Sequence, residues 1–445
     1  MISKQNLDST SHPSLLGTSR PPTVTHSNGG TLNLPFKSSR RDSKRNVYSH
    51  ARLPWELLRN IIRGLEFEPS FKLFDRQHLD PALFVLARTC RALQVEAERV
   101  IYRRIVFRNG TAEALHIGSM LSNRAAEYVE TLCVTHVSYP MHEPFPEDDR
   151  PATSLAHSLP FGRMKRLRSL NISFPPFRET IEEEVEEIEF FKVISQKLPP
   201  DTLHDFISTD QGNLEDLRFL GQQNQLRRLV ASKLPDELLA PSTFPNLLDL
   251  KLERSEINQS LQILDTQALR ALWVSFHDAH LNRPFCGVSL TVLDIEFDFV
   301  SPSDWVLLLN LRVVDCPNIV FLSLWLSLIG IEPMFLPWDE DENADWLSPI
   351  MEVLGRWRRM QALELRAWTS TPPDTLISRI KDACKTPGLC SVWLHARRPD
   401  HDATFKLWRD DCQAWCVSQP KSDHVHDWRD HWKAISMEAP LTLPN

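Results

Sequence analysis

The chain has 445 residues, of which 42% are hydrophobic and 24% are charged, and its formal net charge at pH 7 is −8. This length allows two or three ordinary domains, or one small domain followed by a repeat array. No window approaches about 18 consecutive apolar residues, and no apolar segment follows a basic start, so the sequence predicts neither a membrane span nor a secretory signal. We therefore expect a protein of the cytoplasm, the nucleus or both, without a membrane partner.

The charge is distributed unevenly along the chain. Residues 1–46 carry a net charge of +5, residues 51–108 carry +4, and residues 109–445 are left with −17. An acidic body of this size repels phosphate groups, so we expect no nucleic-acid partner. Residues 1–46 are rich in Ser, Thr, Pro, Gly and Asn, which predicts a disordered tail. The basic run at 38–45 fits either a nuclear import patch or an ordinary solvated tail.

Residues 47–108 have the pattern of a small helical domain. Apolar residues between 57 and 65 repeat at the period of a helix, and Pro54 suits the first helical position. Asp80 and Pro81 form the start signal of a second helix. A third helix is predicted up to residue 101, before a β-prone segment at 105–107. The apolar stripes are Leu57, Leu58, Ile61, Ile62 and Leu65, then Leu83, Leu86, Ala87 and Cys90, then Leu93, Ala97, Val100 and Ile101.

The segment from Leu53 to Ile105 resembles an F-box of the divergent kind common in fungal proteins. Three blocks carry the likeness in order: the opening Leu53-Pro54-x-Glu56-Leu57-Leu58-x-x-Ile61-Ile62, the block at 86–91 and the block at 97–105. The connection at 66–80 is longer than a compact F-box usually has. The resemblance implies that a Skp adaptor binds Leu53, Pro54, Leu57, Leu58, Ile61, Leu86 and Cys90. The same pattern also fits a plain three-helix cap on the array that follows.

From about residue 128 onward one short phrase recurs, Leu-x-x-Leu-x-Leu or a conservative version of it. Between Leu229, Leu250, Leu272, Leu293 and Val314 the steps are 21, 22, 21 and 21 residues, an interval typical of leucine-rich repeats. Each phrase predicts a short strand whose alternate leucines point into a solenoid. Amphipathic strands in another α/β fold are the alternative. The copies begin at Val129, Leu167, Leu226, Leu247, Leu269, Leu290, Leu311 or Ile319, Met360 and Leu389.

The predicted array at 109–403 is irregular. A gap of 59 residues separates Leu170 from Leu229 and contains an acidic helix candidate at 181–189, and an insertion at 330–348 has the composition of an exposed acidic loop. The asparagine that leucine-rich repeats place after the phrase is missing after Leu252, where Ser255 stands. We therefore expect a degenerate solenoid.

Residues 404–445 are predicted to form a helical cap and tail, because Trp408, Cys412, Trp415 and Cys416 recur at helical spacing. Ten of the thirteen tryptophans lie after Asn310, which concentrates amphipathic contact area at this end. The whole sequence thus predicts an α/β protein with a small N-terminal three-helix F-box, an irregular leucine-rich-repeat solenoid and a helical C-terminal cap.

The sequence contains no recognisable active site. It has no phosphate-binding glycine loop, no Gly-x-Ser-x-Gly elbow and no His-Glu-x-x-His motif. Cys412 and Cys416 with nearby histidines supply enough soft ligands for zinc, but their spacing matches no standard zinc site. The eight cysteines are spread singly, which predicts reduced and mostly buried thiols. We expect no enzyme activity, no metal and no cofactor.

The resemblance implies a substrate-recognition subunit of a Skp-cullin-F-box ubiquitin ligase. The F-box would dock the Skp adaptor, and through it the cullin ligase, while the repeats hold an unknown target protein. Strand positions beside the inward leucines, with mixed charges and aromatic rings, suit a protein ligand. The target-binding candidates are Lys251, Trp273, Asp294, Glu296, Trp325, Glu364, Arg366 and Trp393. Two alternatives stay open: a leucine-rich scaffold unconnected with ubiquitin, and an enzyme with a novel site at the tryptophan-rich end.

Overall fold

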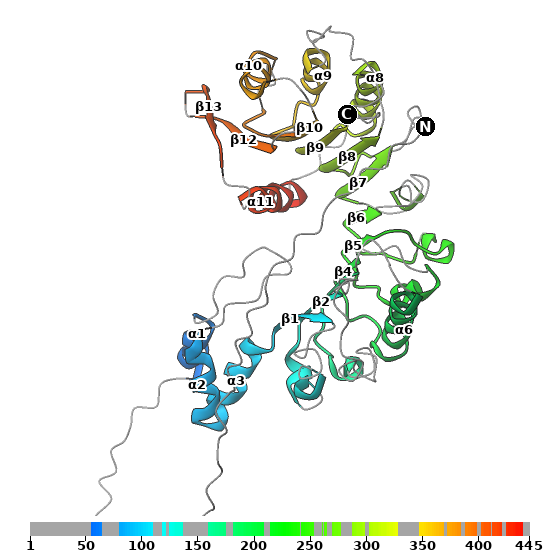
Figure 1. Ribbon diagram of the computed structural model, residues 1–445, viewed down its shortest axis with the longest axis vertical. Coiled ribbons are helices and arrows are strands. Elements are labelled where there is room, and N and C mark those ends of the chain that lie inside the picture. The colour runs from blue at the N-terminus through cyan, green and yellow to red at the C-terminus, as the bar shows by residue number, and fades with distance from the viewer. Residues whose placement is uncertain are drawn as a thin grey trace, which may run out of the picture. The chain divides into compact units, whose positions relative to one another are not determined.

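The computed structural model of the chain describes residues 55–64, 80–109, 118–121, 124–136, 159–174, 181–208, 214–240, 242–252, 260, 262–264, 269–276, 287–298, 302–327, 347–368, 372–383, 388–397, 402–410, 412–420 and 424–438. Several predictions concern residues outside these ranges: the tail at 1–46, Leu53 and Pro54, Leu65, and the acidic loop as far as residue 346. The described elements are drawn in Figure 1.

Three helices occupy the N-terminal described segment: α1 (Trp55–Gly64), α2 (Pro81–Thr89) and α3 (Arg91–Ile101). The predicted start of the second helix is confirmed, because Asp80 Oδ1 accepts a hydrogen bond from the backbone N–H of Ala82 at 2.8 Å and Pro81 is the first helical residue. The helices share a small core of Ile62, Leu83, Val100 and Ile101.

Glu96 links the first and third of these helices. Its carboxylate is buried and lies 3.4 Å from Arg59 Nη2 on α1 and 2.6 Å from Arg99 Nη1 on α3. Because a buried carboxylate is tolerated only when it is paired, these contacts hold α1 against α3.

The strands of the described residues form one 13-stranded sheet, whose spatial order follows the chain from β1 to β13. Neighbours from β1 to β11 pair in parallel, and β12 and β13 add to the end in antiparallel fashion. This confirms the α/β class. The strands are β1 (Arg104–Asn109), β2 (Thr131–His136), β3 (Ser169–Ser173), β4 (Asp205–Ser208), β5 (Arg228–Ala231), β6 (Asp249–Leu252), β7 (Ala271–Phe276), β8 (Val292–Asp298), β9 (Phe321–Ser327), β10 (Ala362–Trp368), β11 (Ser391–Arg397), β12 (Asp402–Arg409) and β13 (Trp415–Ser418).

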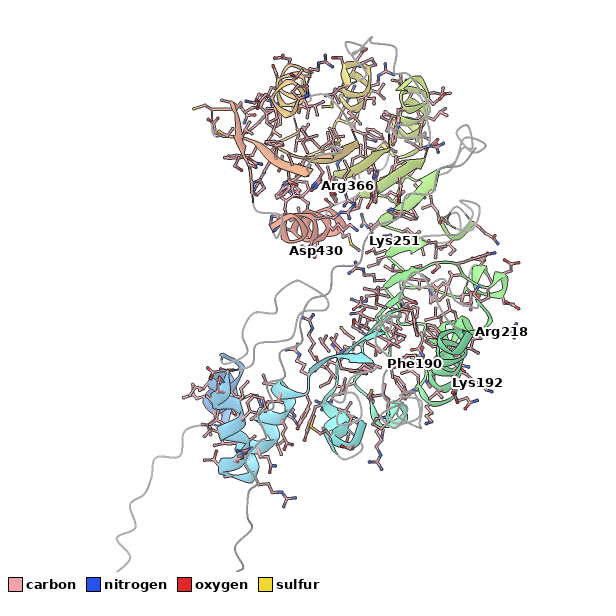
Figure 2. The ribbon with its side chains drawn as sticks, in the orientation of Figure 1. Phe190, Lys192, Arg218, Lys251, Arg366 and Asp430 are labelled. Carbon is pink, nitrogen blue, oxygen red and sulfur yellow. The ribbon has the colours of Figure 1, made fainter. Side chains whose placement is uncertain are left out.

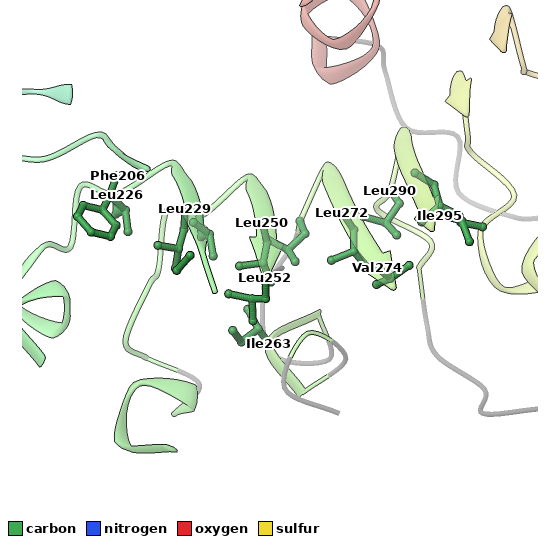
Figure 3. Close-up of a cluster of buried hydrophobic side chains, with 14 of the residues drawn as sticks. Phe206, Leu226, Leu229, Leu250, Leu252, Ile263, Leu272, Val274, Leu290 and Ile295 are labelled. Atoms are coloured by element: carbon green, nitrogen blue, oxygen red, sulfur yellow. The ribbon is translucent and has the colours of Figure 1, made fainter. Parts of the chain in front are cut away.

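The central residue of the recurring phrase occupies one register row across the parallel strands. Every member of this row is almost completely buried, and Figure 3 shows the neighbouring leucines stacked from strand to strand. Between Phe206 and Leu293 the steps along the row are 23, 21, 22 and 21 residues. The row consists of Leu132, Leu170, Phe206, Leu229, Leu250, Leu272, Leu293, Leu322, Leu363 and Val392.

A shared carbonyl repeats at the start of each parallel strand. The carbonyl oxygen of the residue just before one strand accepts hydrogen bonds from two consecutive N–H groups of the next repeat. For example, Arg227 accepts from Leu248 and Asp249 at 2.8 and 3.0 Å, and Leu248 in turn accepts from Arg270 and Ala271 at 2.8 and 2.9 Å. These bonds satisfy the turn backbone and fix the strand register.

Side-chain amides before the strands replace the asparagine that the sequence lacks after them. Gln223 Oε1 accepts from the backbone N–H groups of Thr202 and Leu203, each at 3.0 Å. Asn318 Nδ2 donates to the carbonyl of Val288 at 2.9 Å. In both cases an amide from the following repeat satisfies the backbone of the turn that precedes β4 or β8.

Two strand assignments from the sequence need correction. The strand predicted from Leu311 is wrong, because this segment lies in a helix and Val314 is 78% exposed. The strand follows the alternative phrase that begins at Ile319, so the step from Leu293 to Leu322 is 29 residues. The 59-residue gap contains a further strand, β4. Its phrase has Phe206 and Ser208 in place of leucines, which hid it from the pattern.

The C-terminal segment is not one helical cap. Residues 402–409 and 415–418 are strands, and only 424–438 are helical, as α11 (His424–Glu438). Ala403 and Leu407 are buried and Phe405 is partly buried, so every second side chain faces the core, as in a strand. Gln413, with φ of 63°, lies in the turn between β12 and β13.

Helices cover the leucine side of the sheet. The acidic helix candidate is confirmed as α6 (Ile181–Lys197), and Trp305, Leu354 and Leu376 from the later helices join the leucine core. Short 3-10 helices fill the same layer at η1 (Arg124–Tyr128), η3 (Phe161–Arg163), η4 (Leu214–Gln222) and η5 (Asp236–Leu239). The later helices are α8 (Pro302–Asp315), α9 (Leu347–Leu354) and α10 (Pro373–Ala383).

The cysteines are less buried than expected. Among the described residues six cysteines are reduced thiols, of which Cys133 and Cys316 are buried, whereas Cys90 and Cys412 are exposed. Cys90 lies at the junction of α2 and α3, and Cys412 lies in the turn before β13.

Candidate functional site

Large apolar side chains are exposed on α1 and α2. Leu57 is 49% and Ile61 54% exposed on α1, and Phe84 is 46% and Val85 65% exposed on α2. Ile62 of α1 and Leu83, Leu86 and Ala87 of α2 belong to the small core shared with α3. Exposed groups of this size are a feature of interaction surfaces.

The structure divides the predicted adaptor-binding residues into two groups. Leu57, Ile61 and Cys90 are exposed, whereas Leu58 and Leu86 are half-buried. Leu53 and Pro54 lie outside the described residues. Phe84 and Val85 were not among the predicted residues, because they lie off the stripe of Leu83, Leu86 and Ala87. Large apolar residues on the opposite side of a helix were the available signal.

The strands from β6 to β11 present a second face, opposite the leucine core. Because side chains alternate along a strand, Leu322 and Leu324 enter the core, while Phe321, Ser323 and Trp325 point to the other side. In Figure 1, α8, α9 and α10 lie on one side of β8–β10 and α11 on the other. We call this second face the α11 face, which we define as Asp249, Lys251, Ala271, Trp273, Val292, Asp294, Phe321, Ser323, Ala362, Glu364, Ser391 and Trp393.

Strand register gathers the predicted target-binding residues into two adjacent rows. One row contains Lys251, Trp273, Asp294, Glu364 and Trp393, joined by Ser323. The next row along the strands contains Glu296, Trp325 and Arg366. Two cations lie over rings within these rows: Lys251 Nζ is 5.0 Å from the Trp273 ring centroid, and the Arg366 guanidinium is 5.1 Å from that of Trp325. Figure 2 labels Lys251 and Arg366 on the strands and Asp430 on α11.

An aromatic cluster attaches α11 to this face. Trp428 packs against Trp393 with ring centroids 5.1 Å apart, and edge-on against Phe321 at 5.7 Å. The indole Nε1–H of Trp428 donates to Ser391 Oγ at 3.1 Å. Trp432 and Met437 pack against the same cluster. The buried indole thus has both apolar contacts and a hydrogen-bond acceptor, as a buried tryptophan requires.

Arg429 connects α11 to two carboxylates of the sheet. Its Nη2 donates to Asp294 Oδ2 at 2.5 Å and to Ser323 Oγ at 3.1 Å, and its Nε lies 2.9 Å from Glu364 Oε2. Glu364 is fully buried and also pairs within the sheet, with Arg366 Nη2 at 2.8 Å and His395 Nε2 at 3.4 Å. The carboxylate therefore has partners from both α11 and its own neighbouring strand positions.

The electrostatics of this group follow from burial and charge pairing. Burial raises the pKa of Glu364, but Arg429, Arg366 and His395 outweigh it and hold that pKa well below its usual range. Burial lowers the pKa of Arg429, but Asp294 and Glu364 outweigh it and raise that pKa. The guanidinium and the Glu364 carboxylate are therefore both charged at neutral pH.

Lys433 follows Arg429 by one helical turn and reaches a second acidic position. It lines a small cavity of about 20 Å³ together with Asp249 and Asp294. Burial lowers the pKa of Lys433, and the two carboxylates only partly offset this. Asp249 also pairs with Arg228 at 3.2 Å.

Several predicted target-binding residues are covered by the chain itself. Glu364, Trp393 and Asp294 are buried and contact Arg429 or Trp428 of α11. Trp273 is also buried, whereas Lys251, Glu296, Trp325 and Arg366 are half-buried. These side chains were predicted to lie on an open surface, because the sequence pattern did not place a helix on this face. The signal was the pair Trp428 and Trp432 at helical spacing with adjacent basic residues.

The described residues contain no group of three or more His, Cys, Asp or Glu side chains that could hold a metal ion. Among the helices in these ranges, none combines the length and the apolar character needed to span a membrane. Comparison with protein-family models found no matching family, and comparison with curated proteins found no match either.

Proposed function

We propose that this chain is the substrate-recognition subunit of a Skp-cullin-F-box ubiquitin ligase. In this proposal α1–α3 dock the Skp adaptor, and the strand array holds a target protein near the ubiquitin-charged enzyme. The chain performs no bond chemistry itself; it raises the effective concentration of target lysines at the ligase.

The observation that carries the proposal is the exposure of Leu57, Ile61, Phe84 and Val85 on helices that already have a core of their own. These side chains lie outside that core, so a partner that buries them would gain binding free energy. Burying apolar surface contributes about 25 cal/mol per Å², enough for a few such side chains to anchor an interface. Leu57 and Ile61 belong to the motif that resembles an F-box.

The sheet supports the second half of the proposal. The order of its parallel strands, the buried register row and the repeated shared carbonyl are what a degenerate leucine-rich-repeat solenoid would have. Its α11 face combines tryptophans and carboxylates with one basic side chain, Lys251, a composition that suits a protein ligand.

Co-purification with a Skp adaptor tests the proposal. We expect the full chain to form a stable complex that Leu57→Asp abolishes, because a carboxylate in an apolar interface would be buried without a partner. The matched control is Leu307→Asp on α8, where the leucine is 44% exposed but far along the chain from the motif; this variant should keep the complex. Phe84→Asp gives a second, independent loss.

Failure of the unaltered chain to bind any Skp adaptor would contradict the ligase proposal. That result favours the alternative, a leucine-rich scaffold that binds proteins without any connection to ubiquitin. Unfolding curves of each variant establish that a lost complex reflects the surface and not a lost fold.

A further inference from the structure

The residues that α11 contacts form a cluster separate from the main core of the protein. The leucine core runs under α6 and α8–α10 and contains no residue of α11. Trp428, Trp432 and Met437 instead belong to a second cluster with Ala271, Val292, Phe321, Ala362 and Trp393. The array therefore has a complete core without α11, and this helix can leave the sheet without opening the leucine core.

Two carboxylates of the α11 face, Glu364 and Asp249, also have partners outside α11. Glu364 retains Arg366 at 2.8 Å and His395 at 3.4 Å from neighbouring strand positions, and Asp249 retains Arg228 at 3.2 Å. These partners hold the carboxylates in place. The face is thus a preorganised acidic and aromatic surface, which lowers the cost of binding a ligand.

The contacts of α11 define the chemistry of a ligand for this face. One side of α11 presents Trp428 and Trp432 to the aromatic cluster, and Arg429 and Lys433 to the carboxylates of Asp294, Glu364 and Asp249. Its other side, with Asp430, His431, Ala434 and Ile435, is exposed. The recognised pattern is aromatic-Arg-x-x-aromatic-Lys on one side of an amphipathic helix.

We propose that the α11 face is the surface that binds the target protein, that its ligand is an amphipathic helix with this pattern on one side, and that α11 occupies the surface until such a helix replaces it. The inference rests on the proposed function, because it assigns the target-binding role to one face of the array. Because a ligand must compete with α11, its apparent affinity equals its affinity for the open face multiplied by the fraction of chains in which α11 is undocked.

Binding of a fluorescent peptide with the sequence of residues 424–438 tests this inference on the full chain. Arg429→Glu in the protein places a like charge beside Asp294 and Glu364 and should release α11, so the peptide should bind this variant about tenfold or more tightly than the unaltered chain. The matched control is Lys192→Glu, a charge reversal at an exposed position of α6, which should bind as weakly as the unaltered chain. A peptide with Glu in place of the arginine should lose binding to the Arg429→Glu protein.

Equal peptide affinity for the three proteins would overturn the inference, and so would absence of binding to a folded Arg429→Glu protein. If Arg429→Glu prevents folding, Trp428→Ala takes its place, because it weakens α11 docking without a charge change. The peptide should then bind Trp428→Ala more tightly than the unaltered chain, and equal affinity would overturn the inference. The test is independent of adaptor binding. A chain that captures the adaptor but not the peptide refutes this inference alone, whereas a chain that binds the peptide but no adaptor refutes the ligase function and keeps the helix-binding face.

Discussion

Replacement of Arg429 by methionine should loosen α11 specifically. The substitution keeps most of the apolar stem and removes the guanidinium that contacts Asp294 at 2.5 Å and Glu364 at 2.9 Å. Removal of one partner from a fully buried ion pair costs about 3–5 kcal/mol. Here Glu364 keeps Arg366 and His395, so we expect a smaller loss, about 2–3 kcal/mol, from the charged hydrogen bonds that disappear.

Hydrogen exchange measures this loss directly. The free energy of opening of the α11 amides should fall by about 2–3 kcal/mol in Arg429→Met, while the amides of β7–β9 keep their protection, because α11 lies outside the leucine core. Glu438→Gln, at an exposed position of the same helix, is the control and should change the opening by less than about 0.5 kcal/mol. Unchanged protection of α11 in Arg429→Met would refute the reasoning, and so would an equal loss across the whole sheet.

A double-mutant cycle between Arg429→Met and Asp294→Asn separates the pair from its surroundings. Both residues contact one another, so their effects on α11 opening should not add; we expect a coupling of about 1–3 kcal/mol. Additive effects would mean that the ion pair contributes nothing to the docking of α11.

Two further predictions concern the array and its response to pH. Leu322→Ala should lower the free energy of unfolding, measured in urea, by about 2–5 kcal/mol, because Leu322 is fully buried. Val314→Ala should change it by less than about 0.5 kcal/mol, because Val314 is 78% exposed. If Val314→Ala were instead the more destabilising variant, the strand assignment at Leu311 would be correct. The pKa of Glu364 is held below its usual range, so the folded state binds fewer protons there than the unfolded state does. The resulting stability is present above the unfolded value of about 4.3 and is lost as the pH falls below it, and Glu364→Gln should flatten this part of a pH titration of unfolding.

The sequence predicted most of the strand register, because the alternation that buries Leu229 or Leu250 is written directly into the phrase. It misplaced one strand at Val314, since Leu-x-x-Val also fits one turn of α8, and it missed β4 because Phe206 fills a leucine position. Periodicity indicates which residues form the apolar face of an element. It cannot by itself distinguish a helical turn from a short strand.

The candidate site was only partly predictable for a different reason. Rows such as Asp294 and Glu364 follow from alternation along each strand, and the structure brings them together. The covering helix does not follow, because its docking depends on Arg429 and Trp428 meeting residues more than 30 positions away in the chain. Likewise, one apolar stripe contains both Ile62, which is buried, and Ile61, which is exposed, and only the packing of α1 on α3 separates them.

The central claim is that the exposed apolar residues of α1 and α2 bind the adaptor of a ubiquitin ligase. The most direct measurement is the affinity of the full chain for a purified Skp adaptor, compared with Leu57→Asp and with Leu307→Asp as the exposure-matched control. The account predicts a stable complex that is lost in Leu57→Asp and kept in Leu307→Asp. An unaltered chain that binds no Skp adaptor, or a complex that survives Leu57→Asp, would contradict it.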